Sequence, residues 1–185
     1  MFKSGSKWLI SILKWDKVAA GQIRANEIIR KFTGTFDYAL DAKGRVNIPA
    51  RMREIIALYD LHTLTLRYME LGGFPVIRAY PTNFFNEKIL GKLNDIEGET
   101  AEETFRIMSV TAESHQVKLD GHGRLNIPDD LLKKLDIQKE IRFVGMGDYF
   151  DIWKPETCEK FIAAQKKAQS NGQSRKPGEA TGTSQ

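Results

Sequence analysis

The stretch Asp41-Ala-Lys-Gly-Arg-Val-Asn-Ile-Pro49 returns 79 residues later as Asp120-Gly-His-Gly-Arg-Leu-Asn-Ile-Pro128. Both copies read Asp, two variable residues, Gly, Arg, an aliphatic residue, Asn, Ile and Pro. A short segment of strand-like character precedes each copy and a helix-like segment follows it, so the similarity extends beyond the motif. The chain therefore contains a duplicated structural unit.

The order of residue types in the motif predicts a strand, a tight turn, a second strand and a helix. The Asp carboxylate can accept hydrogen bonds from backbone N–H groups ahead of it. The Gly stands where a tight reversal needs a positive φ. The Pro ends the second strand and can occupy the first position of a helix, where its missing N–H costs nothing. The predicted turn-shaping residues are Asp41 and Gly44 in the first copy and Asp120 and Gly123 in the second.

The rest of the chain predicts short strands and helices arranged in two halves, each with one copy of the motif. Alternation of apolar and polar residues at 36–40 favours a half-buried strand before the first motif. Further strands are expected at 63–67 and 75–80 in the first half, and at 116–119, 140–144 and 149–153 in the second. Helices are expected at 50–58, 82–93, 101–111, 129–135 and from 155 to about 165.

These elements and the changes in composition predict five segments. A basic N-terminal extension precedes the repeat, an acidic and helical linker joins the halves, and a Gly-, Ser- and Gln-rich tail is expected to be disordered. The apolar run at 8–13 in the extension is too short to span a bilayer, so no membrane partner is expected. The predicted segments are 1–31 (extension), 32–94 (first unit), 95–112 (linker), 113–165 (second unit) and 166–185 (tail).

Charge is distributed unevenly along the 185 residues. The formal net charge of +4 divides into +5 for residues 1–31, −4 for residues 32–164 and +3 for residues 165–185. The repeat region is therefore mildly acidic, and bulk charge alone does not argue for nucleic acid. A single cysteine, Cys158, excludes an internal disulfide and a thiolate zinc cluster, and it favours a reducing, cytoplasmic compartment.

No motif in the chain indicates catalysis, a cofactor or a small-molecule substrate. Dinucleotide, P-loop and nucleophile-elbow motifs are absent from the sequence. His62, His115 and His122 lack the spacing and acidic neighbours of a metal site. Asp41 and Arg45 could be drawn as a catalytic pair, but this spacing across a turn is more typical of a stabilising contact. The chain is not expected to be an enzyme, and no metal or cofactor is expected.

The chemistry that remains is the display of cations at the two turns. The first turn presents Lys43 and Arg45, and the second presents His122 and Arg124. An Arg fork suits phosphates and guanine edges, and a major groove admits a two-stranded ribbon. In the alternative interpretation each Arg pairs with its Asp and merely holds the turn. Spacing alone leaves both interpretations open.

Residues 32–164 closely resemble the MraZ family of bacterial transcriptional regulators. The resemblance depends on the run from Phe32 to Arg53, the second motif beginning at Asp120, and the ending from Val144 to Trp153. It implies two tandem AbrB-like swapped-hairpin units, related to the SpoVT-AbrB superfamily, in a β-barrel-like α+β domain. It also implies a ring-shaped homo-oligomer in the cytoplasm, associated with the nucleoid.

The resemblance implies binding to repeated double-stranded DNA sites upstream of the division and cell-wall gene cluster, including the protein's own upstream region. It places DNA contact on Arg45 with Lys43 beside it, and on the matching positions Arg124 and His122. The chain departs from the family at His122, where Lys or Gln is more usual, which makes the second turn less basic. The alternative function is a protein-interaction module of related hairpin fold, either antitoxin-like or a scaffold, without specific DNA binding.

Overall fold

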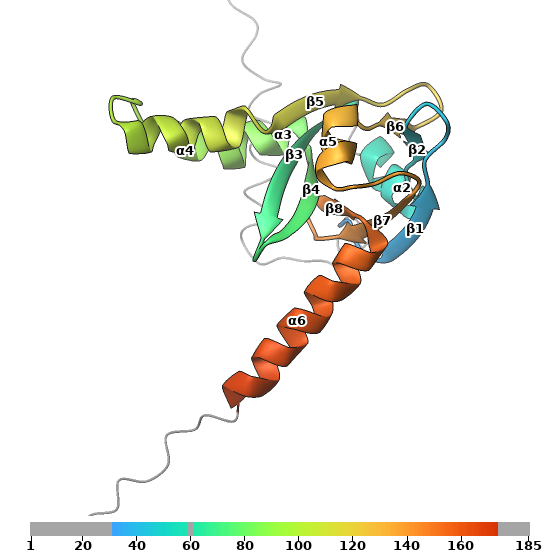
Figure 1. The fold of residues 1–185 in the computed structure, drawn as a ribbon. Helices are drawn as coiled ribbons and strands as arrows, with labels where there is room; N and C mark the ends of the chain where they lie inside the picture. The colour runs from blue at the N-terminus through green and yellow to red at the C-terminus, as the bar shows by residue number, and fades with distance from the viewer. Residues whose placement is uncertain (1–30, 59–60, 174–185) are drawn as a thin grey trace, which may run out of the picture. The chain divides into compact units, whose positions relative to one another are not determined.

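The computed structural model describes residues 31–58 and 61–173, and the part from Phe32 onwards forms one unit. Helices and strands follow one another as the repeat predicts (Figure 1). The first half contains β1 (Thr35–Ala39), β2 (Arg45–Asn47), α2 (Ala50–Leu58), β3 (Thr63–Leu71) and β4 (Phe74–Pro81). Between the halves lie α3 (Thr82–Phe84), the π-helical η2 (Phe85–Ile89), the 3-10 helix η3 (Leu90–Leu93) and α4 (Ala101–Thr111). The second half contains β5 (Ser114–Lys118), β6 (Arg124–Asn126), α5 (Asp129–Lys134), β7 (Glu140–Gly145), β8 (Phe150–Trp153) and α6 (Pro155–Gln173).

The strands of both halves belong to one antiparallel six-stranded sheet of order β1-β7-β8-β4-β3-β5. The first strand of each half pairs with the third strand of the other half, as β1 with β7 and β5 with β3. The fourth strands, β4 and β8, pair at the centre. If each strand is replaced by its counterpart in the other half, the same order is obtained, read from the opposite edge of the sheet. The order of the strands is therefore two-fold symmetric. A second, two-stranded sheet joins β2 to β6.

The α+β class is confirmed, and the predicted strands and helices lie within a few residues of the observed ones. The predicted helix at 82–93 is divided into α3, η2 and η3. Gly91 lies within this segment, and Gly is a poor helix former. Phe85 is also buried there against Tyr80, with ring centroids 5.5 Å apart. Helix α6 reaches Gln173, beyond the predicted end at about residue 165, because residues 163–168 are mostly Ala, Gln and Lys, which favour helix.

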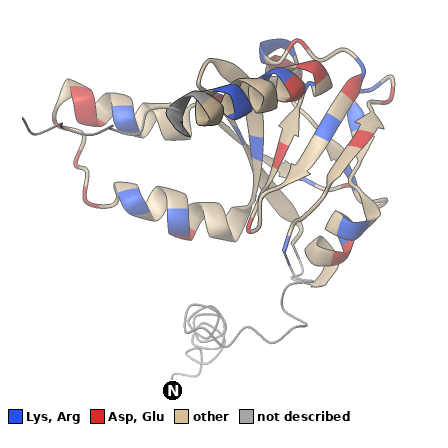
Figure 2. Ribbon diagram, turned by 90° about the horizontal axis from the view of Figure 1, so that it is seen from below, with Lys and Arg blue, Asp and Glu red and all other residues tan. Residues whose placement is uncertain are grey.

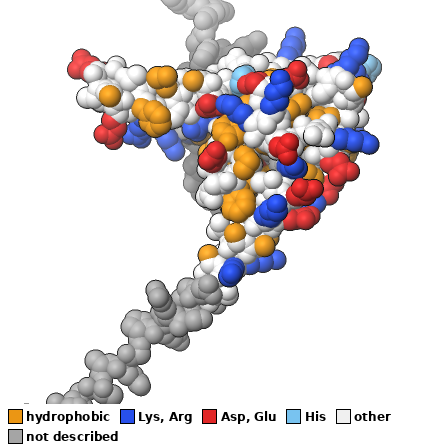
Figure 3. All heavy atoms as spheres, viewed as in Figure 1, with side chains coloured by type: hydrophobic (Ala, Val, Ile, Leu, Met, Phe, Trp, Pro, Cys, Tyr) orange, Lys and Arg blue, Asp and Glu red, His pale blue; other side chains and the backbone are white. Residues whose placement is uncertain are grey.

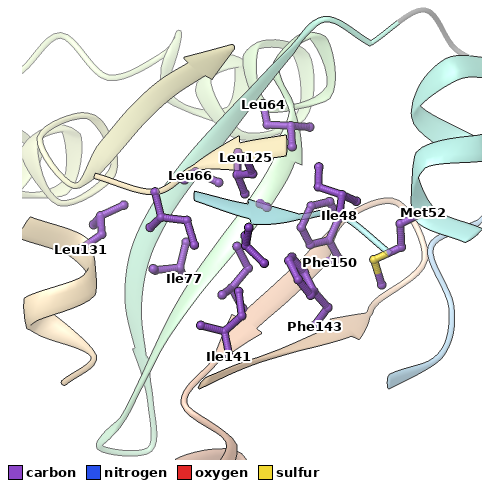
Figure 4. Close-up of a cluster of buried hydrophobic side chains, with 14 of the residues drawn as sticks. Ile48, Met52, Leu64, Leu66, Ile77, Leu125, Leu131, Ile141, Phe143 and Phe150 are labelled. Atoms are coloured by element: carbon purple, nitrogen blue, oxygen red, sulfur yellow. The ribbon is translucent and has the colours of Figure 1, made fainter. Parts of the chain in front are cut away.

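One hydrophobic core is shared by both halves (Figure 4). Phe143 and Phe150 from the second half are fully buried and lie close to Ile48 and Met52 from the first. Leu125 of β6 lies over the same cluster and is 0% exposed. Since neither half encloses these side chains alone, the two halves depend on each other for burial.

Residues 1–30 and 174–185 lie outside the described residues, so the predictions for the basic extension and for the end of the tail are not addressed by the structure. The apolar run at 8–13 falls in this part. Among the residues that the structure describes, no helix is both long and apolar enough to cross a membrane.

Candidate nucleic-acid interface

The first turn is organised by the carboxylate of Asp41. Its Oδ1 accepts hydrogen bonds from the backbone N–H groups of Lys43 and Arg45, at 2.9 and 3.0 Å. The N–H of Gly44 donates to the carbonyl of Asp41 at 3.0 Å, and Gly44 has a φ of 72°. An L side chain rarely adopts that φ, so the turn depends on Gly at this position.

The second turn has the same geometry. The Oδ1 of Asp120 accepts hydrogen bonds from the backbone N–H groups of His122 and Arg124, both at 2.9 Å. Gly123 has a φ of 71° and donates to the carbonyl of Asp120 at 2.9 Å. The replacement of Lys by His in this copy therefore leaves the backbone of the turn unchanged.

Each Asp also holds the guanidinium of its Arg. Arg45 Nε donates to Asp41 Oδ2 at 2.8 Å, and Arg124 Nε donates to Asp120 Oδ2 at 2.7 Å. Arg45 Nη2 also approaches Asp41 Oδ2, at 2.6 Å. The side chains remain 30% and 28% exposed. Each Arg is thus both paired and displayed, so the pairing does not exclude a contact with a ligand.

The guanidinium groups of Arg45 and Arg124 differ in how many of their nitrogens remain without a hydrogen bond. Within the part of the chain that the structure describes, neither Nη of Arg124 makes a hydrogen bond, and Nη1 of Arg45 makes none. A guanidinium held at Nε and open at Nη is pre-organised for a planar acceptor, because less rotamer freedom is lost on binding.

The turn contacts lower the pKa of both carboxyl groups. Hydrogen bonds from the Arg45 side chain and then from backbone N–H groups hold the pKa of Asp41 well below its usual range. Backbone N–H donation from Arg124, followed by its side chain, lowers the pKa of Asp120 to about 2. Both carboxyl groups are therefore ionised at neutral pH, in the form that accepts the hydrogen bonds of the turns.

We expect the turns to loosen only in strong acid. A carboxyl whose folded pKa is depressed contributes stability above its unfolded pKa, and that contribution is lost as pH falls through the folded value. For Asp120 this window runs from the ordinary 3.8 down to about 2. The amide NMR signals of His122 and Arg124 should titrate in this window and should not do so in Asp120→Asn. A midpoint at 3.8 would show that these hydrogen bonds are absent in solution.

The two turns are joined through the β2–β6 ribbon. In its register Arg45 lies opposite Asn126, Val46 opposite Leu125, and Asn47 opposite Arg124. Val46 and Leu125 are 1% and 0% exposed and form the inner face. Because side chains alternate along a strand, both Arg residues lie on the outer face.

Each turn is seated on the helix of the other half. A Cβ added at Gly44 would lie 3.7 Å from Leu132 of α5. A Cβ added at Gly123 would lie 3.1 Å from Cδ of Arg53 of α2. Arg53 and Leu132 occupy equivalent positions, four residues after Pro49 and Pro128. The second turn therefore gains a basic neighbour that its own half does not supply.

Sequence reasoning missed Arg53, Asn47 and Asn126. The two Asn residues belong to the repeated motif and stand two positions after an Arg, which places them on the same side of a strand. That spacing could have identified them. Nothing local indicates the position of Arg53, because the turn that it contacts lies 70 residues further along the chain.

The other side chains that could bind a metal ion or a nucleic acid are the histidines and the charged residues of the surface. His115 Nε2 lies 3.2 Å from Asp130 Oδ2. Within residues 31–58 and 61–173, no group of three or more His, Cys, Asp or Glu side chains could hold a metal ion. Lys and Arg are interspersed with Asp and Glu in Figures 2 and 3. A binding surface for nucleic acid therefore has to be local, as the ribbon is.

Comparison with known proteins finds one family and several relatives that share its name. The family described as "MraZ protein, putative antitoxin-like" matches residues 110–178. The "Transcriptional regulator MraZ" of Rhodospirillum rubrum is 30% identical over 139 residues, which cover 74% of this chain and 88% of that protein. The protein of the same name from Cytophaga hutchinsonii is 31% identical over 131 residues, covering 71% and 84%. That of Anaeromyxobacter dehalogenans is 29% identical over 134 residues, covering 72% and 91%.

Proposed function

Since the chain belongs to the MraZ family, we propose that it is a transcriptional regulator that binds specific double-stranded DNA through the outer face of the β2–β6 ribbon. The observation that carries this proposal is the pair of equivalent turns on one ribbon, each holding an Arg fork by its Nε. An Arg fork matches the O6 and N7 acceptors of guanine, and a two-stranded ribbon fits the major groove.

The neighbouring cations supply contacts to the DNA backbone. Lys43 is exposed at the first turn, and Arg53 lies against the second. Such contacts position a protein on the duplex without reading its sequence. Binding should therefore weaken steeply as salt is raised, because each neutralised phosphate releases counterions.

The pairing of the strands supports a swapped-hairpin architecture of the AbrB type. The two units are residues 32–94 and 113–165, and the linker 95–112 joins them. The first strand of each unit pairs with a strand of the other unit. The β1–β7 and β5–β3 pairs are the exchange that such an architecture requires. In this arrangement the DNA-facing ribbon exists only when both halves are folded together.

A homo-oligomer would explain how so few cations bind DNA well. Two Arg forks on a mildly acidic domain give weak binding, whereas several copies on repeated sites raise avidity by roughly 10²–10⁴. The resemblance to the MraZ family supports a ring. It also supports repeated sites upstream of the division and cell-wall cluster, with the protein's own upstream region among them and the protein held at the nucleoid.

The test is fluorescence anisotropy with labelled duplexes that tile the gene's upstream region. We expect the intact chain to prefer one repeat-bearing tile. Arg45→Ala should weaken binding to that tile at least about tenfold, because a bidentate Arg–guanine contact contributes roughly 1–3 kcal/mol of discrimination. Arg106→Ala is the matched control, because Arg106 is an exposed cation on α4 rather than on the ribbon.

Light scattering should show the same oligomer for all three proteins, so that lost avidity is not mistaken for a lost contact. If the intact chain binds every tile equally at moderate salt, specific DNA binding is wrong. If both Arg variants lose affinity equally, the ribbon is not the contact surface.

A protein-interaction module is the second candidate, and exposed apolar residues on α4 favour it. Phe105 and Met108 are 72% and 55% exposed, and Figure 3 shows hydrophobic side chains on this helix. Exposed apolar surface of this kind is typical of interaction sites. A partner protein that co-purifies in a fixed ratio, together with no preference among the tiles, would favour this function.

A further inference from the structure

Two asparagines complete the outer face of the ribbon. Asn47 and Asn126 are exposed and follow Arg45 and Arg124 at the second position along their strands. In the register of β2 and β6, Arg45 lies opposite Asn126 and Asn47 lies opposite Arg124. Residues that face each other across an antiparallel pair lie on the same side of the sheet. The outer face is therefore built of two columns, each with one Arg and one Asn.

Neither asparagine side chain stabilises the fold through a hydrogen bond or a helix cap among the described residues. In the described part of the chain, no hydrogen bond involves the side-chain amide of either residue. They do not cap the helices that follow, since Pro49 and Pro128 intervene and α5 begins without a side-chain cap. Asn is disfavoured in strands. Two exposed asparagines at equivalent strand positions thus disfavour the strand locally, and no side-chain hydrogen bond among the described residues offsets this.

The spacing of the columns suits a DNA duplex. Residues two apart on a strand are separated by roughly 7 Å, and successive base pairs along one strand of B-DNA lie about 3.4 Å apart. The two columns are therefore about two base-pair steps apart. Residues within a column are about 5 Å apart, which lets an Arg and an Asn reach neighbouring base edges within a major groove about 12 Å wide.

The chemistry of the asparagine amide identifies the base. The amide donates through its nitrogen and accepts through its oxygen, which matches the N7 acceptor and N6 donor of adenine. We propose that Asn47 and Asn126 are sequence-reading residues, each bound to the major-groove edge of an adenine beside the guanine read by the Arg of its column. This inference rests on the proposed DNA-binding function and adds the base class that the ribbon selects.

The test uses the full chain and the duplex tile that the intact protein prefers. Each A·T pair of that tile is replaced in turn by G·C, and binding is measured by anisotropy for the intact chain, Asn47→Ala, Asn126→Ala and the double variant. Asn86→Ala is the matched control, because Asn86 is exposed on η2. Circular dichroism and light scattering establish that all variants keep the fold and the oligomer.

For the intact chain, we expect certain A·T replacements to weaken binding about tenfold. Each Asn→Ala variant should bind the original tile about tenfold more weakly and should no longer respond to one set of these replacements, since coupled groups do not add. Asn86→Ala should behave as the intact chain does.

The inference is overturned if the Asn variants keep the full response to every A·T replacement. It is also overturned if they weaken binding equally on all sequences, which is the mark of a phosphate contact. In both cases the intact chain still prefers one tile, and the proposed function stands. An intact chain without any preferred tile overturns the proposed function itself, and this inference with it.

Discussion

Replacing Arg78 by Met should lower the free energy of unfolding by about 3–5 kcal/mol, the cost of leaving a buried charge without its partner. Arg78 of β4 lies opposite Asp151 of β8 at the centre of the sheet. Its Nε and Nη2 donate to the two carboxylate oxygens at 2.8 and 3.1 Å, and its guanidinium lies 4.5 Å from the centroid of the Tyr149 ring. Asp151 is only 1% exposed.

Burial already raises the pKa of Asp151, although the neighbouring guanidinium acts in the opposite direction. Without Arg78 the carboxyl should be protonated still more readily. A carboxyl whose pKa is raised by folding favours the folded state at low pH and opposes it at high pH. The loss caused by Arg78→Met should therefore be smaller at about pH 5 than at pH 7.

Arg142→Met is a matched control for this prediction. Arg142 of β7 lies opposite Asp37 of β1 and also forms two hydrogen bonds to the carboxylate, at 2.6 and 2.8 Å. The side chain of Asp37, however, is 59% exposed. Water can solvate it after the change, so we expect a loss of less than about 1 kcal/mol.

Urea unfolding measures both variants, at one fixed protein concentration because oligomerisation alters apparent stability. The double variant Arg78→Met/Asp151→Leu should recover most of the loss, since it leaves no unpaired charge. Equal losses for Arg78→Met and Arg142→Met would show that burial of the carboxylate is not the cause.

Leu125→Ala should lower the free energy of unfolding by about 2–5 kcal/mol, because it removes buried methyl groups and leaves a cavity. Leu125 is fully buried on the inner face of the β2–β6 ribbon, against the core shared by both halves. The same change at Leu58 is the control, since that side chain is 56% exposed. Leu58→Ala should shift stability by no more than about 0.5 kcal/mol.

This prediction also tests the interdependence of the two halves. Leu125 packs into a cluster that includes Ile48 and Met52 of the first half. Its loss should destabilise the whole described unit in one transition, measured by urea unfolding with two probes. Separate transitions, with only one shifted, would show that the halves fold independently.

The turns could be predicted from the sequence because the interactions that build them are local. The Asp41 carboxylate reaches no further than Arg45, and Gly44 acts through its own φ. The period of two at residues 36–40 likewise predicted β1, because a half-buried strand needs no distant information to show its pattern. The helical stretch expected at 82–93 is present, but it is divided into α3, the π-helical η2 and the 3-10 helix η3, where Phe85 packs against Tyr80.

The arrangement of the candidate site could be predicted only in part, because the outer face of the ribbon combines β2 from the first motif with β6 from the second. The side chains of Lys43, Arg45, His122 and Arg124 were identified as displayed, and each was expected to act at its own turn. The partnership of Arg45 with Asn126 depends on strand register, which short motifs do not specify. Arg53 reaches Gly123 only because each turn rests on the opposite helix.

The sequence by itself determined the duplication and the strand–turn–strand–helix order of each unit, because these follow from contacts within a few residues and from hydrophobic periodicity. Only the tertiary structure decided that strands of one half pair with strands of the other, that β2 pairs with β6, and that Arg78 is matched with Asp151. The last two of these contacts join residues more than 70 positions apart. They form because neither half can bury its apolar face alone, and that shared burial aligns two Arg and two Asn side chains on one exposed face.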